Sequence, residues 1–267
     1  MDDLWEVYAI KYAERNSRTR HQSFVLDDDH ATPHDMDYFL WVLRSGSRTI
    51  VVDTGYDEAE GKRRGRPILR DPVPALKSVD VAADSVDTLI LTHLHYDHAG
   101  GIDLFPRAQI HLQEAELSFV TGPCMCHGHL RKPFSADHVC SVIQRLYSGR
   151  ITIHNGDGLI APGVTVHHIG GHTAGLQAVR VKTKSGWFCL ASDASHYYEN
   201  FLTGTPFPIV VDVAAMLDGF QTIQGLASKP SLVVPGHDPL VFDYFEPMDG
   251  LAPYVRRLDL GPRSDFC

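Results

Sequence analysis

The sequence lacks the features that would place the chain in a membrane or make it depend on disulfide bonds. No uninterrupted apolar stretch approaches the roughly 20 residues of a membrane-spanning helix. The first ten residues, MDDLWEVYAI, carry acidic side chains where a signal peptide has basic ones. The cysteines are odd in number and lack the spacing of a disulfide framework: Cys124, Cys126, Cys140, Cys189 and Cys267. We therefore expect a cytoplasmic protein without a membrane partner.

Positive charge is also scarce. The chain has 24 Lys and Arg against 33 Asp and Glu, a formal net charge of −9. A protein that binds nucleic acid needs a concentrated positive surface, because phosphate contacts dominate that affinity. The composition therefore argues against a nucleic-acid partner, and it favours a small neutral or weakly charged substrate.

Strand-like and helix-like runs alternate along the whole chain, and no linker or repeat divides them, so we expect one domain over residues 1–267. Residues 38–55 predict two strands joined by a turn at 45–47. Further strands are predicted over 86–92, 108–113, 150–154, 164–170, 176–183, 187–192 and 231–238. One amphipathic helix is predicted over 137–147, with Val139, Val142, Ile143 and Leu146 on its apolar face. A second is predicted from Val213, Met216, Leu217, Phe220 and Ile223. This mixture is typical of a layered domain.

A dense group of metal-binding side chains follows the apolar run at 86–92. The segment LTHLHYDHAGG, residues 91–101, contains His93, His95, Asp97 and His98. On an extended segment, side chains two positions apart point the same way, so His93 and His95 are expected to converge. Burying all four groups without a metal would be costly in desolvation and mutual repulsion. The pattern therefore predicts a metal site.

The spacing of these four residues favours two metal ions over one, because the local backbone aims the side chains in two directions. Each ion then needs ligands from elsewhere in the chain. Three candidates each follow an apolar strand-like run: His172 in IGGHTAG, Asp193 in LASDASH and His237 in VVPGHD. A carboxylate such as Asp193 can bridge two ions, whereas a histidine cannot.

These motifs, from about Asp53 to Asp238, resemble those of the metallo-β-lactamase superfamily. The resemblance implies an α+β fold, an αββα sandwich in which two mixed β-sheets pack face to face with helices outside and the metals at one edge. It implies one ion bound by His93, His95 and His172, a second bound by Asp97, His98 and His237, and Asp193 as the bridge. Asp53, in VVDTG, matches a family aspartate that orients a metal-bound histidine.

Position 193 and its surroundings distinguish branches of this superfamily. Members that cleave β-lactams usually carry cysteine there, and glyoxalase II-like members continue with a glycine-arginine element that SDASHYYENF lacks. This segment and the chain length instead resemble the N-acyl homoserine lactonase branch, in which a tyrosine commonly lies three residues after the bridging aspartate. His196 occupies that position here, and we expect it to hydrogen-bond the substrate carbonyl or the oxyanion formed from it. The open alternative is that Tyr197 or Tyr198 supplies a phenol.

The ligand set and the resemblance together predict an enzyme that opens the ring of an N-acyl homoserine lactone or a similar small lactone. Two divalent ions that share a water lower its pKa to about 7, so that a bridging hydroxide can attack the ester carbonyl. We expect Asp97 to pass a proton to the leaving ring oxygen. Five imidazoles, two carboxylates and no thiolate make zinc the default metal, with manganese, iron or cobalt as alternatives.

Other activities stay open at this point. A glyoxalase II-like thioester hydrolase or a phosphodiester hydrolase would use the same ligands. A metal-dependent oxygenase or redox module is the non-hydrolytic alternative, weakened because the resembling diiron proteins carry an acidic residue where His95 stands. We expect a monomer or a homodimer.

Four segments are candidates for the substrate pocket or its surroundings. Phe24, Met36 and Tyr38, with Tyr197, are expected to wall the pocket. Residues 201–210 are apolar and broken by proline, unlike a helix or strand, and predict either a pocket wall or an ordinary loop. The basic stretch 56–74 predicts a solvated loop, with a lid as the minority alternative. Cys124 and Cys126, in GPCMCHGHL, predict a loop near the mouth of the active site rather than a soft metal site.

Overall fold

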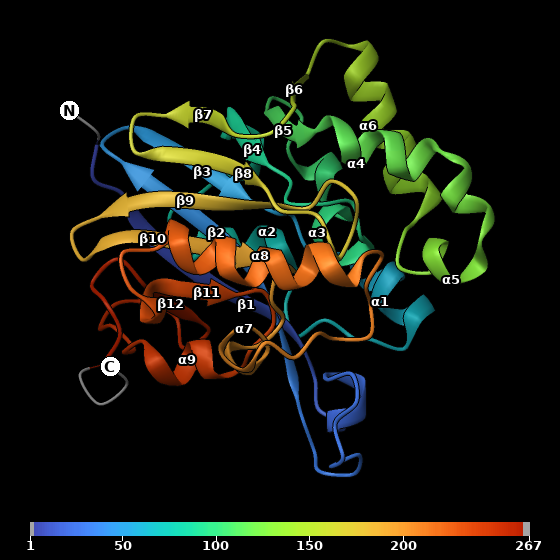
Figure 1. Cartoon of the computed structure of the whole chain (residues 1–267). Coiled ribbons are helices and arrows are strands. Elements are labelled where there is room, and N and C mark those ends of the chain that lie inside the picture. Colours follow the sequence, from blue (N-terminus) through green and yellow to red (C-terminus); the bar gives the residue numbers. More distant parts are fainter. Residues whose placement is uncertain (1–2, 264–267) are drawn as a thin grey trace.

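The computed structural model describes residues 3–263, and Cys267 lies outside them. Two β-sheets pack face to face with helices on both outer sides (Figure 1). The larger sheet has seven strands, in the order β12 (Val255–Arg257), β1 (Glu6–Arg15), β2 (Met36–Ser45), β3 (Arg48–Val52), β4 (Thr88–Ile90), β5 (Gln109–Gln113) and β6 (Ile151–His154). The smaller has five, in the order β11 (Val233–Pro235), β10 (Gly186–Ser192), β9 (Gln177–Thr183), β8 (Val164–His168) and β7 (Gly158–Ala161).

Both sheets are mixed. In the larger sheet, β12, β1, β2 and β3 pair antiparallel, and β3 to β6 pair parallel. In the smaller sheet, β7 to β10 pair antiparallel, and β10 pairs parallel with β11. This arrangement confirms the predicted αββα sandwich.

Nine α-helices lie among the described residues: α1 (Glu58–Arg64), α2 (Pro72–Lys77), α3 (Tyr96–Ala99), α4 (Glu114–Thr121), α5 (Gly128–Arg131), α6 (Ala136–Tyr147), α7 (Tyr198–Thr203), α8 (Val213–Leu226) and α9 (Leu240–Tyr244). Side chains of α2, α3, α4 and α6 belong to the apolar cluster on the outer face of the larger sheet. Side chains of α7, α8 and α9 belong to the cluster that also fills the space between the sheets.

The central strands are buried on both faces, which explains their nearly continuous apolar sequences. In β2, Phe39 and Trp41 point into the cluster between the sheets, while Leu40 and Val42 point into the cluster under the helices. All four side chains are at most 2% exposed. The alternation follows from the two-residue period of a strand.

Several predicted elements agree with the structure, and three need correction. The turn between β2 and β3 is centred on Gly46 at a positive φ of 58°. On α8, Val213 and Leu217 were expected on the buried face, yet they are 48% and 37% exposed. Gly219 is buried instead, because its missing side chain lets the helix approach Ile169 closely.

The basic stretch 56–74 is not simply a solvated loop, since it contains α1 and the start of α2. Asp57 caps α1 by accepting from the amide of Glu60, and Gly65 ends the helix in the left-handed conformation. The segment 201–210 begins inside α7. Gly204, which follows the last residue of that helix, is also in the left-handed conformation. In both cases the residues at the helix ends, rather than apolar periodicity, mark where the short helix lies.

The strands that matter for function end at the same place. Asp53 and His93 follow the parallel neighbours β3 and β4, and Asp193 and His237 follow the parallel neighbours β10 and β11. Because neighbouring parallel strands end at the same edge of a sheet, these side chains meet at one end of the sandwich. Figure 1 shows α3, which follows β4, at the end away from the two chain termini.

Glu116, in α4, ties together two of the loops at this end. Its Oε1 accepts from the amide of Leu94 at 2.9 Å, and its Oε2 accepts from the hydroxyl of Thr173 at 2.6 Å and the amide of Gly175 at 3.0 Å. The side chain is fully buried. A Cβ on Gly175 would lie 2.0 Å from the Glu116 amide nitrogen, so only glycine allows this approach. One carboxylate therefore fixes the loop of His93 and His95 against the loop of His172.

This arrangement makes Glu116→Gln a test of the loop geometry. The amide group of glutamine cannot accept from all three donors, so at least one buried backbone N–H loses its acceptor. We expect the free energy of unfolding to fall by about 1–3 kcal/mol. The matched control is Glu114→Gln, which changes an exposed carboxylate of the same helix. Denaturant unfolding that gave the two variants the same stability would contradict this role for Glu116.

Candidate metal centre

Eight of the residues singled out in the sequence converge at this end of the sandwich. They form overlapping groups whose nitrogen or oxygen atoms lie within 4.8 Å of one another. One group contains His93, His95, His172 and Asp193; a second contains Asp97, His98 and His237; a third contains Asp193, His196 and His237. All of these residues are buried except Asp97, which is partly exposed.

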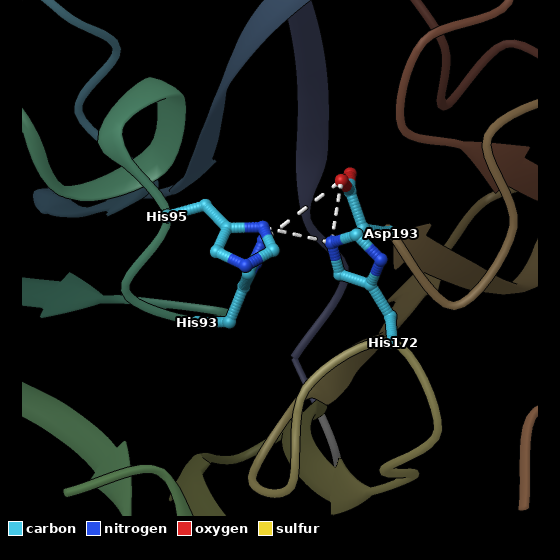
Figure 2. Close-up of side chains that lie close together, drawn as sticks. All are labelled: His93, His95, His172 and Asp193. Carbon is cyan, nitrogen blue, oxygen red and sulfur yellow. Dashed lines mark hydrogen bonds and ion pairs between the residues drawn. The ribbon is translucent and has the colours of Figure 1, made fainter. Parts of the chain in front are cut away.

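In the first group, three imidazoles face one carboxylate oxygen (Figure 2). His172 Nε2 lies 3.2 Å and His93 Nε2 3.8 Å from Asp193 Oδ2. His172 Nε2 also lies 2.9 Å from His95 Nδ1. His93 and His95 come from the segment between β4 and α3, His172 from the loop after β8, and Asp193 from the end of β10.

The second group faces the other oxygen of the same carboxylate. His237 Nε2 lies 3.1 Å and His98 Nε2 3.3 Å from Asp193 Oδ1. The same two nitrogens lie 3.9 Å and 4.0 Å from Asp97 Oδ2. Asp193 thus turns Oδ2 toward the first group and Oδ1 toward the second, with His237 Nε2 also 3.3 Å from Oδ2. A carboxylate in this position could lie between two cations.

Several buried polar atoms of these groups have no hydrogen-bond partner among residues 3–263: His93 Nε2, His98 Nε2 and Asp193 Oδ1. A buried polar atom without a partner costs about 1–3 kcal/mol. All three atoms face the space between the two groups, and nitrogen and carboxylate oxygen are both good ligands for divalent transition metals. The donor set therefore fits a pair of such ions.

The remaining ring nitrogens are held by the surrounding protein. His98 Nδ1 donates to Asp53 Oδ2 at 2.8 Å, His172 Nδ1 to the carbonyl of Ile209 at 2.7 Å, and His237 Nδ1 to the carbonyl of Asp37 at 2.7 Å. Each bond leaves Nε2 as the nitrogen that faces the centre. Asp53 has the position that the sequence predicted for it, and Thr92 fixes it further through its amide and hydroxyl.

The protonation of the centre follows from burial and from the balance of charges. Burial, then the neighbouring imidazoles, hold the pKa of His93 and His95 well below the usual value, so both are neutral and able to bind a metal. Burial also opposes charge on His98, but Asp193, Asp53 and Asp97 outweigh it and raise the pKa of His98. Burial works against charge on Asp193, yet the surrounding histidines lower its pKa well below the usual range. The centre therefore holds a carboxylate that requires nearby positive charge.

A cavity of about 220 Å³ opens onto these groups. Its lining includes Met36, Tyr38 and His196, as expected, together with Tyr96 and Ile209. The expected wall residues Phe24 and Tyr197 do not line it and lie behind it.

The reason is that both rings are occupied elsewhere. Phe24 is 2% exposed and packs against the rings of His34 and Tyr197. The Tyr197 hydroxyl donates to the carbonyl of Asp35 at 3.1 Å. Tyr198 is also outside the lining and packs against Phe201 and Tyr244.

His196 lies at the boundary between the cavity and the centre. Its Nε2 lies 3.0 Å from Asp193 Oδ2 and donates to it, because the carboxylate accepts. Its ring stacks on Phe207, with the ring centroids 3.6 Å apart. Burial lowers the pKa of His196 to about 3, so the imidazole is neutral. The 201–210 segment thus contributes Phe207 and Ile209 to the surroundings of the site.

Sequence reasoning missed the basic side chains of the cavity. Arg18, Arg64, Arg66, His129 and Lys132 all line it. Arg64 and Arg66 lie in and just after α1, in the stretch expected to be solvated. A run of basic residues is usually exposed, and only the burial of α1 against the sandwich turns these two toward the site.

Cys124 and Cys126 take part in none of the candidate metal groups found among residues 3–263. Cys126 is exposed and Cys124 partly exposed, in a short 3-10 turn between α4 and α5. The neighbouring His129 and Lys132 line the cavity, which agrees with a loop near its mouth. No helix in the described part of the chain is long and apolar enough to cross a membrane.

Comparison with known proteins supplies relatives over most of the chain. An N-acyl homoserine lactonase from a Bacillus species is 29% identical over 227 residues, which cover 78% of this chain and 80% of the relative. The N-acyl homoserine lactonase AiiB from Rhizobium rhizogenes is 30% identical over 192 residues, covering 62% of this chain and 66% of the relative.

Solved structures agree on the fold. An N-acyl homoserine lactone hydrolase with N-hexanoyl-L-homoserine at its catalytic metal center superposes with a TM-score of 0.74 at 23% identity, covering 91% of this chain and 96% of the other. AidC, a dizinc quorum-quenching lactonase, gives a TM-score of 0.69 at 15% identity, covering 99% and 96%. The metallo-beta-lactamase superfamily model matches residues 38–237. This range contains the whole candidate metal centre. The chain therefore belongs to the metallo-β-lactamase superfamily.

Proposed function

We propose that this protein is a dinuclear metal-dependent hydrolase that opens the ring of a small lactone, an N-acyl homoserine lactone or a similar compound. The observation that carries the proposal is Asp193, whose two oxygens face two separate groups of metal-binding side chains at the base of a cavity. The lactonase names of the relatives point to the same reaction class.

The two groups of ligands correspond to two ion positions. His93, His95 and His172 would hold one ion, and Asp97, His98 and His237 the other, with Asp193 between them. Two divalent ions held there, zinc being the default for this ligand set, would supply a water of lowered pKa as the nucleophile and a Lewis acid for the carbonyl. Asp53 orients His98 through the bond to its Nδ1.

The chain's own side chains carry the remaining steps. Asp97 lines the cavity, and its carboxylate is 11% exposed, so it can pass a proton to the ring oxygen as the ester bond breaks. His196 lines the same cavity, and its single N–H, which donates to Asp193 in this structure, would turn to a bound carbonyl. Met36 and Tyr38 provide an apolar wall for the rest of the substrate.

The other activities that the sequence left open have less support. The relatives compared above are named lactonases, none a thioester hydrolase, a phosphodiesterase or a redox protein. The monomeric or homodimeric state stays a prediction from the sequence.

The reaction class can be tested by comparing substrates on one metal-loaded preparation. We expect kcat/KM for N-acyl homoserine lactones to exceed that for a glutathione thioester or a phosphodiester by about tenfold or more, equivalent to 1.4 kcal/mol in transition-state binding. Removing the metal with a chelator should abolish lactone opening, and zinc should restore it. A kcat/KM for the glutathione thioester about tenfold above that for the lactones would refute the lactonase proposal.

His196 can be tested separately from the metal ligands. An oxyanion-stabilising donor contributes roughly 2.7–4 kcal/mol, so His196→Ala should lower kcat by about a hundredfold or more with unchanged metal content. The control is Tyr197→Phe, which removes a hydroxyl that bonds to Asp35 outside the cavity and should leave kcat near the wild-type value. If Tyr197→Phe lost activity and His196→Ala kept it, the phenol rather than the imidazole would assist the carbonyl.

A further inference from the structure

Three arginines gather beside the cavity without a carboxylate partner. Arg18 and Arg66 line the cavity. Arg15 lies close enough to both that their charges act on its guanidinium group. Among residues 3–263, none of the three guanidinium groups forms an ion pair within 4.0 Å. Their hydrogen bonds go to neutral groups, since Arg18 donates to the carbonyl of Gln22 and the hydroxyl of Ser23, and Arg66 donates to the hydroxyl of Tyr96.

Arg18 is the most unusual of the three. It is only 5% exposed, and its Nε has no hydrogen-bond acceptor. A buried charge is normally paired, because desolvation is otherwise uncompensated. The Nε–H of Arg18 is therefore a donor that lacks its acceptor in a residue that lines the cavity.

The three charges also act on one another. Burial, and then the guanidinium groups of Arg66 and Arg18, lower the pKa of Arg15. Burial opposes charge on Arg66 as well, but Tyr38, Tyr96 and Asp97 outweigh it and raise its pKa, so Arg66 stays charged. Asp97 belongs to the metal centre and forms no ion pair with Arg66, so it does not neutralise the cluster.

Arg64, another basic side chain of the cavity, differs from these. Arg64 is paired with Glu60 through its Nε, and it donates to the carbonyls of Lys132 and Phe134. Arg15, Arg18 and Arg66 together, called here the arginine cluster, thus provide unpaired positive charge at the cavity in a chain whose net charge is −9.

We propose that the arginine cluster binds an anionic group of the substrate, so that the preferred lactone carries a carboxylate, or another oxyanion such as sulfate or phosphate, remote from its ring. Guanidinium groups present planar forks of donors that match carboxylate and phosphate oxygens. An oxyanion in the cavity would place negative charge beside Arg18 and Arg66 and would relieve the repulsion among the three cations. The lactone carbonyl would meanwhile lie at Asp193 and His196, and Tyr38 would line the space between. This inference rests on the proposed lactonase function and replaces the neutral or weakly charged substrate expected from composition.

The test uses two homoserine lactones of equal acyl length, one chain ending in a carboxylate and the other in a primary amide. The metal-loaded enzyme should open the carboxylate form with a kcat/KM about tenfold higher or more, the effect of one charge-assisted hydrogen bond. Arg66→Gln should remove most of this preference by lowering kcat/KM for the carboxylate form much more than kcat/KM for the amide form. Sulfate added at constant ionic strength should inhibit the carboxylate form more strongly than the amide form.

Two further variants complete the experiment. Arg18→Gln should lower the preference for the carboxylate form as Arg66→Gln does. If this substitution of a buried residue prevents folding, the test rests on Arg66, which is partly exposed. The control is Arg107→Gln, whose side chain is 65% exposed and pairs only with Asp87 at 3.5 Å, and it should keep the wild-type preference.

Two outcomes separate this inference from the proposed function. Equal kcat/KM for the two lactones in the wild type, or an equal loss for both in Arg66→Gln, would overturn the anion site and leave the lactonase intact. Failure of the metal-loaded enzyme to open any lactone, charged or neutral, would overturn the proposed function itself.

Discussion

The carboxylate of Asp193 is the group on which the rest of the site depends. It is buried at the end of β10, where a negative charge is stable only with positive charge or strong donors around it. Histidines from four separate parts of the chain supply those contacts. These parts are the segment after β4, the loop after β8, the turn before α7 and the end of β11. The strand ends therefore have to converge at this point of the sandwich, because the buried carboxylate of Asp193 needs contacts from all of them.

The surrounding protein holds these histidines rigidly. Asp53 fixes His98, and backbone carbonyls fix His172 and His237, so each ring can turn only slightly. Glu116 acts one layer further out by joining the loops that carry His93 and His172. Such supporting contacts set ligand direction and therefore metal affinity.

The candidate metal ligands could be predicted from the sequence because their signals are local. His93, His95, Asp97 and His98 lie within six positions, and Asp193 and His237 each directly follow an apolar strand. The sandwich itself followed from the resemblance that these motifs carry. The predicted strands were mostly correct in place, although β1, β7 and β12 were not anticipated.

What the sequence could not reveal depends on long-range packing. Glu116 looks like an ordinary acidic residue of a helix, and only the fold brings Leu94 and Gly175 to it. Arg66 lies in a basic run that normally means exposed surface, and its place at the cavity depends on how α1 packs. Phe24 and Tyr197 were expected to wall the cavity, but they pack against each other and Tyr197 donates to Asp35, and neither lines it.

The charge of the molecule is distributed unevenly, and this has a consequence for the substrate. The net charge is −9, yet the cavity is lined by arginine and lysine side chains. Arginine and lysine side chains gather in this cavity around the carboxylates of Asp97 and Asp193, and a local concentration of positive charge attracts anionic ligands. Net charge averages over the whole surface and therefore does not reveal such a concentration.

The central claim is that Asp193 lies between two metal ions. Anomalous X-ray scattering at the absorption edge of zinc, on crystals of the zinc-loaded protein, locates each ion directly. We expect two peaks on opposite sides of the Asp193 carboxylate, one among His93, His95 and His172 and the other among Asp97, His98 and His237. A single peak, or a peak coordinated by His196 in place of either set, would contradict it.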